Sequence, residues 1–346
     1  MRTSTRIRNG QFGKPTFITA GLNATVADPL GGGTIVINAV AGADFSTVYG
    51  VLFGSTPASS WTMNSPTRIT AITPPMAVGV TTISLQAASG SVSNPFEIWA
   101  PSTPGSDTLF LDTPPPGAIP PYGTRGYTVT GGVGTWKART NPSGPLSSYS
   151  NSGGARIAPA ENPAGSPSFS LSIANEKLAS IVGPNNFGQL LGASHAIPYV
   201  MALVLDVNSL PALNGYSLPF GDDNGTTGSC NIQWDWNGKP YHYYFDGVSR
   251  SASLGNNAIV VGRNIIIASR IPNGTVAAID IEVNNVLSAQ VTVGDLTPFG
   301  NTYVGTPIYS GSIYRTSASI KAVYTAQRNY TAAEKLKLYQ WAISMH

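Results

Sequence analysis

Two carboxylates in the stretch "AIDIEV", residues 278 to 283, have the spacing that hydrolytic chemistry needs. Asp280 and Glu282 are two positions apart, and because successive side chains of a strand point to opposite sides, both would lie on one face of a sheet. Retaining glycoside hydrolysis uses two carboxyl groups about 5 to 5.5 Å apart, one as nucleophile and one as acid. The pair is the nearest approach to a catalytic site in the sequence, but a plain exposed strand face is the favoured interpretation, and no catalytic residue is predicted.

Other catalytic and metal-binding patterns are weakly represented. His195, His242 and His346 are the only histidines, and none has the spacing of a metal-binding triad. No Gly-x-Ser-x-Gly elbow or phosphate loop is present, and the sequence indicates no cofactor. Asp222 and Asp223 in "GDDNG" could offer oxygen ligands to Ca²⁺, but such a loop is more commonly a plain turn.

The stretch "QWDWNGKPYHYYFDG", residues 233 to 247, is the most aromatic part of the chain. Asn237 and Gly238 predict a tight turn between two strands, and alternation would place Trp234 and Trp236 together on one face. Flat rings beside polar groups suit a sugar, whose C–H face stacks on a ring while its hydroxyls form hydrogen bonds. The alternative is that the rings fill a core or a subunit interface. The candidate glycan-binding residues are Trp234, Asp235, Trp236, Tyr241, His242 and Tyr244.

Basic residues gather only at the start of the chain. "MRTSTRIRNGQFGK" contains Arg2, Arg6, Arg8 and Lys14 with few apolar residues, which is typical of a flexible arm or of a peptide that docks on an acidic partner. The net charge of +3 reflects scarce acids rather than abundant bases. A broad nucleic-acid-binding surface is therefore not expected.

The composition predicts an all-β protein. Charged residues make up 10% of the 346 residues, below the ~25% of ordinary soluble proteins, while Gly 38 and Pro 27 are abundant. Cys230 is the single cysteine, so no intrachain disulfide is expected. The chain contains neither an apolar run long enough to span a membrane nor the apolar segment of a secretory signal, which predicts synthesis in a cytoplasm and no membrane partner.

Short apolar runs separated by turns predict a small β-sandwich over residues 15 to 100. The segments "PLGGGTIVI", "YGVLFGSTPASSWTMNSPTRITAITPP" and "TTISLQAASGSVSNPFEIW" resemble, in order and spacing, the IPT/TIG domain. That resemblance implies an immunoglobulin-like fold. The proline-rich range 101 to 121, which contains "DTPPPGAIPP", is expected to be a linker or surface loop.

Longer and more apolar runs predict a larger jelly-roll sandwich over residues 122 to 346. The segments "YVMALVLDVNS", "NIIIASRIPNGTVAAIDIEVNNVLSAQ" and "SIKAVYTAQRNYTAAEKLKLYQWAI" resemble the concanavalin A-like superfamily in its laminin G-like form. The glucanases of that superfamily carry a third acid two residues before the pair, and Ala278 occupies this position. The resemblance therefore implies a sandwich without catalytic activity.

One helix is expected at the end of the chain. Thr331 and Glu334 match a capping box, and Leu336, Tyr339 and Ala342 or Ile343 recur at helical spacing. This pattern predicts an apolar face on Leu336 and Tyr339, with Lys335 and Lys337 in solvent. The resemblance implies that the helix packs on the edge of the larger sandwich.

Together the two resemblances indicate a surface-displayed protein, although no export signal is evident. A tailed-bacteriophage virion protein, assembled in host cytoplasm and released by lysis, fits both facts, as a head decoration protein or a tail fibre component. Its expected partners are other virion proteins, reached through Arg2, Arg6, Arg8 and Lys14, a surface glycan, and further copies of itself, with a trimer favoured by analogy. A bacterial surface or secreted carbohydrate-binding protein and a glycoside hydrolase are the alternatives.

Overall fold

The computed structural model describes residues 15–18, 21–101, 108–112, 126–138, 148–150, 157–162, 165–169, 179–186, 190–222, 229–245, 250–295, 301–306 and 316–345. The chain divides into two compact units, one of residues 1–101 with 343–346 and one of residues 102–342. Within the described residues, no helix is both long and apolar enough to cross a membrane.

The first unit contains two small sheets. One has the order β1 (Val26–Ala27), β8 (Val92–Ile98), β7 (Gly79–Ala87), β3 (Val48–Phe53), β4 (Thr56–Pro57). The other has the order β2 (Thr34–Asn38), β6 (Arg68–Ile72), β5 (Ser60–Ser65). Alternation in β2 buries Ile35 and Ile37 in the core that also contains Phe53 and Phe96, whose rings meet edge to face at 5.2 Å. These residues form the core of a β-sandwich.

A glycine contact joins two of the segments that the sequence comparison singled out in this unit. Gly31 has a φ of +73°, and a Cβ at this position would lie 2.6 Å from the Pro74 carbonyl carbon and the Pro75 nitrogen. Gly32 donates a backbone hydrogen bond of 2.8 Å to the Thr73 carbonyl. Only glycine permits so close an approach of two backbones at such a φ.

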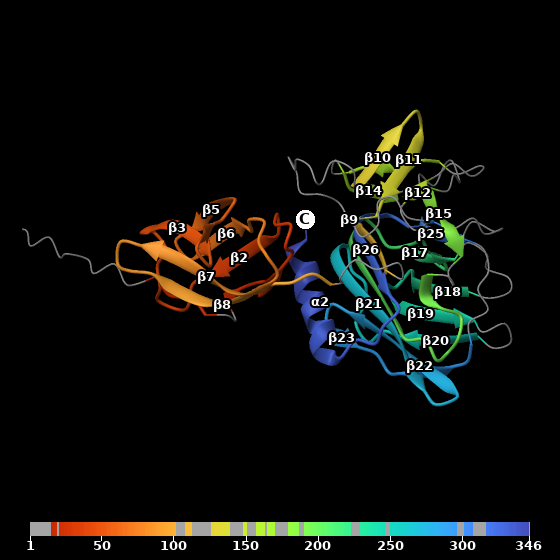
Figure 1. The fold of residues 1–346 in the computed structure, drawn as a ribbon. Coiled ribbons are helices and arrows are strands. Elements are labelled where there is room, and N and C mark those ends of the chain that lie inside the picture. Colours follow the sequence, from red (N-terminus) through yellow and green to blue (C-terminus); the bar gives the residue numbers. More distant parts are fainter. Residues whose placement is uncertain are drawn as a thin grey trace, which may run out of the picture. The chain divides into compact units, whose positions relative to one another are not determined.

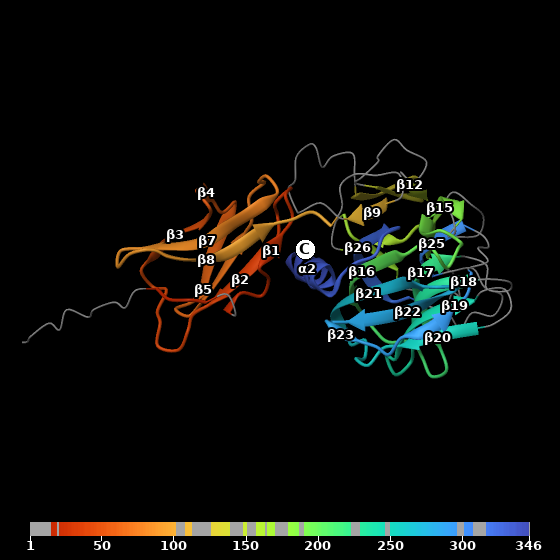
Figure 2. The ribbon, with the colours of Figure 1, turned by 60° about the horizontal axis from the view of Figure 1, so that its bottom comes forward.

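Two larger sheets make up the second unit (Figure 2). Sheet I has the order β10 (Gly126–Thr130), β11 (Val133–Lys137), β12 (Ser148–Ser150), β15 (Ser180–Asn186), β25 (Asn301–Gly305), β17 (Tyr216–Asp222), β18 (Ser229–Asp235), β19 (Pro240–Phe245), β20 (Arg250–Leu254). Sheet II has the order β13 (Ala160–Glu161), β14 (Pro167–Phe169), β26 (Ala318–Ala326), β16 (Tyr199–Val207), β21 (Gly262–Asn273), β22 (Val276–Val283), β23 (Val286–Leu287). In addition, β9 (Thr108–Asp112) pairs with β26, and β24 (Val291–Val293) pairs with β22.

Side chains from both sheets fill one core in this unit. Met201, Leu203 and Leu205 of β16 meet Ile232 and Trp234 of β18 in a single buried cluster. The other face of β16 is buried as well, which explains its uninterrupted apolar run. The prediction of an all-β protein with one C-terminal helix is confirmed.

The helix α2 (Ala332–Ser344) covers the outer face of sheet II rather than its edge (Figure 1). Lys335 reaches Asp280 on β22, while the Trp341 ring meets Phe110 of β9 at 5.3 Å. Because β21, β16 and β26 lie between β22 and β9, the helix crosses the width of the sheet. The predicted capping box is confirmed: the Thr331 amide donates to Glu334 (2.9 Å), and the Glu334 amide donates to the Thr331 hydroxyl (3.2 Å).

The predicted apolar face of this helix is correct at Ala342, which is buried, and wrong at Leu336, which is exposed. Lys335, Leu338 and Trp341 are buried, while Leu336 remains 46% exposed. The physical reason is that two carboxylates beneath the helix bind the Lys335 ammonium, so a charged residue occupies the docked face. Apolar spacing alone does not reveal this attraction.

Part of the predicted proline-rich linker, residues 101 to 121, is a strand. Residues 108 to 112 form β9, whose Leu109, Phe110 and Leu111 are buried, and whose register with β26 pairs Asp112 with Ala322. The Asp112 carbonyl also accepts a 3.1 Å hydrogen bond from the Trp136 indole. Three consecutive apolar residues therefore favour strand formation here despite the neighbouring prolines. Residues 102–107 and 113–121 of the predicted linker lie outside the described residues.

Candidate functional site

The six predicted glycan-binding residues lie in the β18–β19 hairpin of sheet I, and three of them face the core. Cys230 pairs with Tyr244, and Trp234 with Pro240, in the antiparallel register. Trp234, Tyr244 and His242 are fully buried. The prediction that these three residues contact a glycan is therefore wrong, because alternation directs them into the space between the sheets.

His242 belongs to a buried polar network that joins sheet I to sheet II. Its Nδ1 lies 2.9 Å from the Asp280 carbonyl, and its Nε2 lies 2.9 Å from the Tyr199 hydroxyl and 3.6 Å from Cys230 Sγ. Burial lowers the pKa of His242 to about 4, so the ring is neutral at pH 7. A carbonyl can only accept, hence Nδ1 donates to Asp280 and Nε2 accepts from Tyr199.

Arg270 is the fixed positive charge of this network. Its guanidinium is buried and donates to the carbonyls of Ile197 (2.8 Å) and Gly192 (2.6 Å). It also donates to the Tyr244 hydroxyl (3.2 Å) and stacks over the Tyr199 ring at 4.5 Å. The Tyr244 hydroxyl and the Tyr199 ring thus make internal contacts with Arg270, and burial raises the pKa of Tyr244.

The remaining aromatic residues form a surface group that we call the ring cluster: Tyr216, Trp236 and Tyr241. All three are half-buried. The Tyr216 ring meets the Trp236 ring at 6.4 Å and 81°, and the Tyr241 ring at 6.4 Å and 62°. Trp236 lies beyond the end of β18, so it does not share the environment of Trp234, which the alternation argument had assumed.

Sequence reasoning missed Tyr216. It lies at the start of β17, and the register places it opposite Asp235 of β18. Its membership of the ring cluster depends on the pairing of β17 with β18, and no pattern within one strand carries that information.

Asp235 shapes the turn rather than offering a free carboxylate. One oxygen accepts from the amides of Asn237 (2.8 Å) and Lys239 (2.9 Å), and the other accepts from the Tyr241 hydroxyl (3.1 Å). Gly238, with a φ of +74°, completes the turn, since a Cβ there would lie 2.2 Å from the Ile259 carbonyl oxygen. The role of Asp235 is to position Tyr241.

Lys239 is an exposed cation beside the ring cluster. Its ammonium lies 5.9 Å from the centre of the Tyr241 ring. In the part of the chain that the structure describes, no carboxylate pairs with it. Desolvation, followed by the negative charge of Asp235, raises the pKa of Tyr241 to about 12, so its hydroxyl stays protonated.

The carboxylate pair Asp280 and Glu282, considered in the sequence as a possible catalytic pair, has an internal partner. The Lys335 ammonium lies 3.1 Å from Asp280 Oδ1 and 3.0 Å from Glu282 Oε1. Both carboxylates are nearly inaccessible under α2. They share one face of β22, as the spacing predicted, but α2 covers that face.

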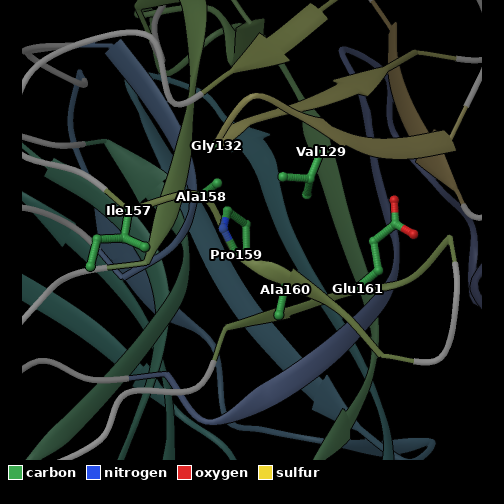
Figure 3. Close-up of a pocket in the computed structure, with 7 residues that line it drawn as sticks. All are labelled: Val129, Gly132, Ile157, Ala158, Pro159, Ala160 and Glu161. Atoms are coloured by element: carbon green, nitrogen blue, oxygen red, sulfur yellow. The ribbon is translucent and has the colours of Figure 1, made fainter.

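A hollow of about 640 Å³ lies beside the β10–β11 hairpin (Figure 3). Residues 157 to 161 form one wall, and Val129 and Gly132 line the hairpin side. The lining side chains are apolar except for that of Glu161, whose carboxylate accepts a hydrogen bond of 3.3 Å from the Gly165 amide. No aromatic ring is among the described lining residues.

Two sequence predictions concern residues that the structure does not describe. Arg2, Arg6, Arg8 and Lys14 lie outside the described residues, as does Asp223. The backbone of Asp222 ends β17, and its side chain is not described.

Comparisons with known proteins give distant matches only. No family model matches the chain, and no curated protein matches it. The CBM40 of the Ruminococcus gnavus IT-sialidase is 13% identical, covers 42% of this chain and 83% of its own, and has a TM-score of 0.35. The binding domain of botulinum neurotoxin serotype D is 8% identical, with coverages of 67% and 50% and a TM-score of 0.43. The Trypanosoma rangeli sialidase is 12% identical, with coverages of 69% and 33% and a TM-score of 0.39. At these values no family or ligand transfers to this chain, and membership of the IPT/TIG and concanavalin A-like families stays a prediction.

Proposed function

We propose that this chain is a non-catalytic glycan-binding protein that holds a sugar on the ring cluster of its larger sandwich. The observation that supports this most directly is that Tyr216, Trp236 and Tyr241 gather at one end of sheet I with their rings partly accessible. Partly exposed rings offer apolar surface to the C–H groups of a sugar, and neighbouring polar groups can take its hydroxyls.

The absence of catalysis is part of the proposal. Asp280 and Glu282 are paired with Lys335 beneath a helix, whereas a glycosidase needs both carboxyl groups beside the scissile bond. His242, the buried histidine of the sandwich, is hydrogen-bonded on both ring nitrogens and has no exposed surface. The hollow at Glu161 has no aromatic ring among its described lining residues, whereas the ring cluster offers a stacking surface for a sugar.

The test is binding to a panel of immobilised oligosaccharides, with maltohexaose, cellohexaose, chitohexaose, hexagalacturonate and sialyllactose as probes. We expect Trp236→Ala to weaken binding about tenfold or more, because truncating an aromatic anchor commonly costs above ~1 kcal/mol. Tyr49→Ala is the matched control, since Tyr49 is 66% exposed in the first unit. Equal binding by both variants would contradict the proposed site, and no binding by the unaltered protein would contradict the function.

A location on a bacteriophage virion remains part of the proposal and is supported by the resemblance of the two sandwiches to displayed modules. The basic residues Arg2, Arg6, Arg8 and Lys14 would bind an acidic surface of a neighbouring virion protein. Copurification with intact particles, and its loss on deletion of residues 2 to 14, tests this assignment. Many copies per particle would indicate head decoration, and few would indicate a tail.

A further inference from the structure

We infer that the ring cluster takes an acidic sugar, one that carries a carboxylate or sulfate group, and that Lys239 is the residue that selects it. This inference rests on the proposed glycan-binding function and specifies its substrate class. The observation behind it is the juxtaposition of the exposed Lys239 ammonium with the Tyr241 ring, 5.9 Å from its centre.

The local charge balance favours an anion. Asp235 lies beside the ring cluster, and it is 94% buried, with both oxygens accepting hydrogen bonds from Asn237, Lys239 and Tyr241. It therefore has little surface to offer to a ligand. The exposed charge beside the rings is the ammonium of Lys239, so a stacked sugar with a negative group gains an attraction that a neutral sugar lacks.

Among the described residues no carboxylate pairs with Lys239, whereas other cations of the same unit have internal partners. Lys335 pairs with Asp280, and Lys321 lies 3.5 Å from Asp206. The Arg270 guanidinium is buried and donates to backbone carbonyls. Lys239 is exposed and its ammonium contacts the Tyr241 ring, so its three donors can reach a ligand.

The turn fixes the backbone position of Lys239. Its amide is held by Asp235 at 2.9 Å, and the preceding Gly238 donates to the Asp235 carbonyl at 2.9 Å and accepts from the Ile259 amide at 2.8 Å. The backbone at residue 239 is thus fixed relative to Trp236 and Tyr241, the rings on either side of it in the sequence. A sugar stacked on either ring would have its acidic group within reach of the flexible lysine side chain.

The experiment compares acidic and neutral probes on the full chain. We expect hexagalacturonate or sialyllactose to bind at least tenfold more tightly than maltohexaose in 20 mM salt, with the advantage shrinking in 300 mM salt because exposed charges are screened. Lys239→Gln should remove most of that advantage without changing maltohexaose binding, and Lys239→Arg should retain it. Lys137→Gln, an exposed lysine on β11, is the matched control and should change neither.

The outcomes separate this inference from the function on which it rests. If neutral sugars bind as tightly as acidic ones, Trp236→Ala removes binding and Lys239→Gln has no effect, the acidic preference is wrong and the glycan site stands. If Lys137→Gln weakens acidic binding as much as Lys239→Gln, net charge rather than this site is responsible, and the assignment is overturned. If no probe binds, both proposals are wrong.

Discussion

At the scale of single residues, neighbouring positions in one hairpin have opposite roles. Trp234 is fully buried while Trp236, two positions later, is half-exposed, because β18 ends at Asp235 and the chain turns there. His242 and Tyr241 are adjacent, and the first is in the core whereas the second is in the ring cluster. The side of the sheet that each residue faces determines whether it serves stability or binding.

His242 should make folding of the second unit sensitive to mild acid. Its pKa is about 4 in the folded state, below the ~6.5 of an unfolded chain, so the unfolded state takes up the proton first as pH falls. Stability is full above pH ~6.5 and is lost as pH falls toward 4. Between pH 7 and pH 5 this single group should lower the free energy of unfolding by about 2 kcal/mol.

Urea unfolding at the two pH values measures this effect. His242→Gln should be less stable at pH 7 yet should lose most of the pH dependence. His195→Gln, which alters the surface histidine that contacts Asp295, should keep it. The same pH slope in His242→Gln and in the unaltered protein would show that another group is responsible.

At the scale of elements, α2 is held by a buried ion cluster as well as by apolar contacts. Lys335 bridges Asp280 and Glu282, and the Trp341 ring packs on Phe110. The side chain of Lys335 is only 8% exposed, so its loss would leave two carboxylates without a counter-charge in a site that water hardly reaches.

Lys335→Met should therefore destabilise the second unit by roughly 3 to 5 kcal/mol. Adding Asp280→Asn and Glu282→Gln to that variant should recover much of the loss, since no unpaired charge remains. Leu336→Ala, at the 46% exposed neighbouring position, is the control and should cost less than ~1 kcal/mol. Thermal unfolding of the variants measures this; a larger loss for Leu336→Ala than for Lys335→Met would place the docked face where apolar spacing predicted it.

At the scale of the whole molecule, the chain consists of two units with separate cores, and β9 belongs to the second. Strand β9 contributes three buried side chains, Leu109, Phe110 and Leu111, and it pairs with β26 over its full length. In the sequence, the packed part of the second unit thus begins at β9, before most of the prolines of residues 101 to 121.

A fragment of residues 102 to 346 should therefore be more stable than a fragment of residues 113 to 346. Removing β9 exposes the edge of β26 and takes three apolar side chains from the core and from the contact with α2, which should cost more than ~3 kcal/mol. Circular dichroism during thermal unfolding compares the two fragments. Equal melting temperatures would show that β9 is dispensable.

The sequence by itself determined the elements whose signals are local. Alternating or continuous apolar runs predicted strands such as β2 and β16, and Thr331 and Glu334 predicted the helix start. The spacing of Asp280 and Glu282 correctly placed both on one face. These features depend on residues a few positions apart, so the printed order of residues contains them.

Tertiary structure decided which faces are buried and which residues meet. The contact of Lys335 with Asp280 joins positions 55 residues apart, and the pairing of Tyr216 with the Trp236 turn depends on strand register. Trp234, His242 and Tyr244 were binding candidates in the sequence, but they are buried in the core. Part of the proline-rich segment pairs with β26 and forms β9. Such outcomes depend on long-range packing free energies that no local pattern contains.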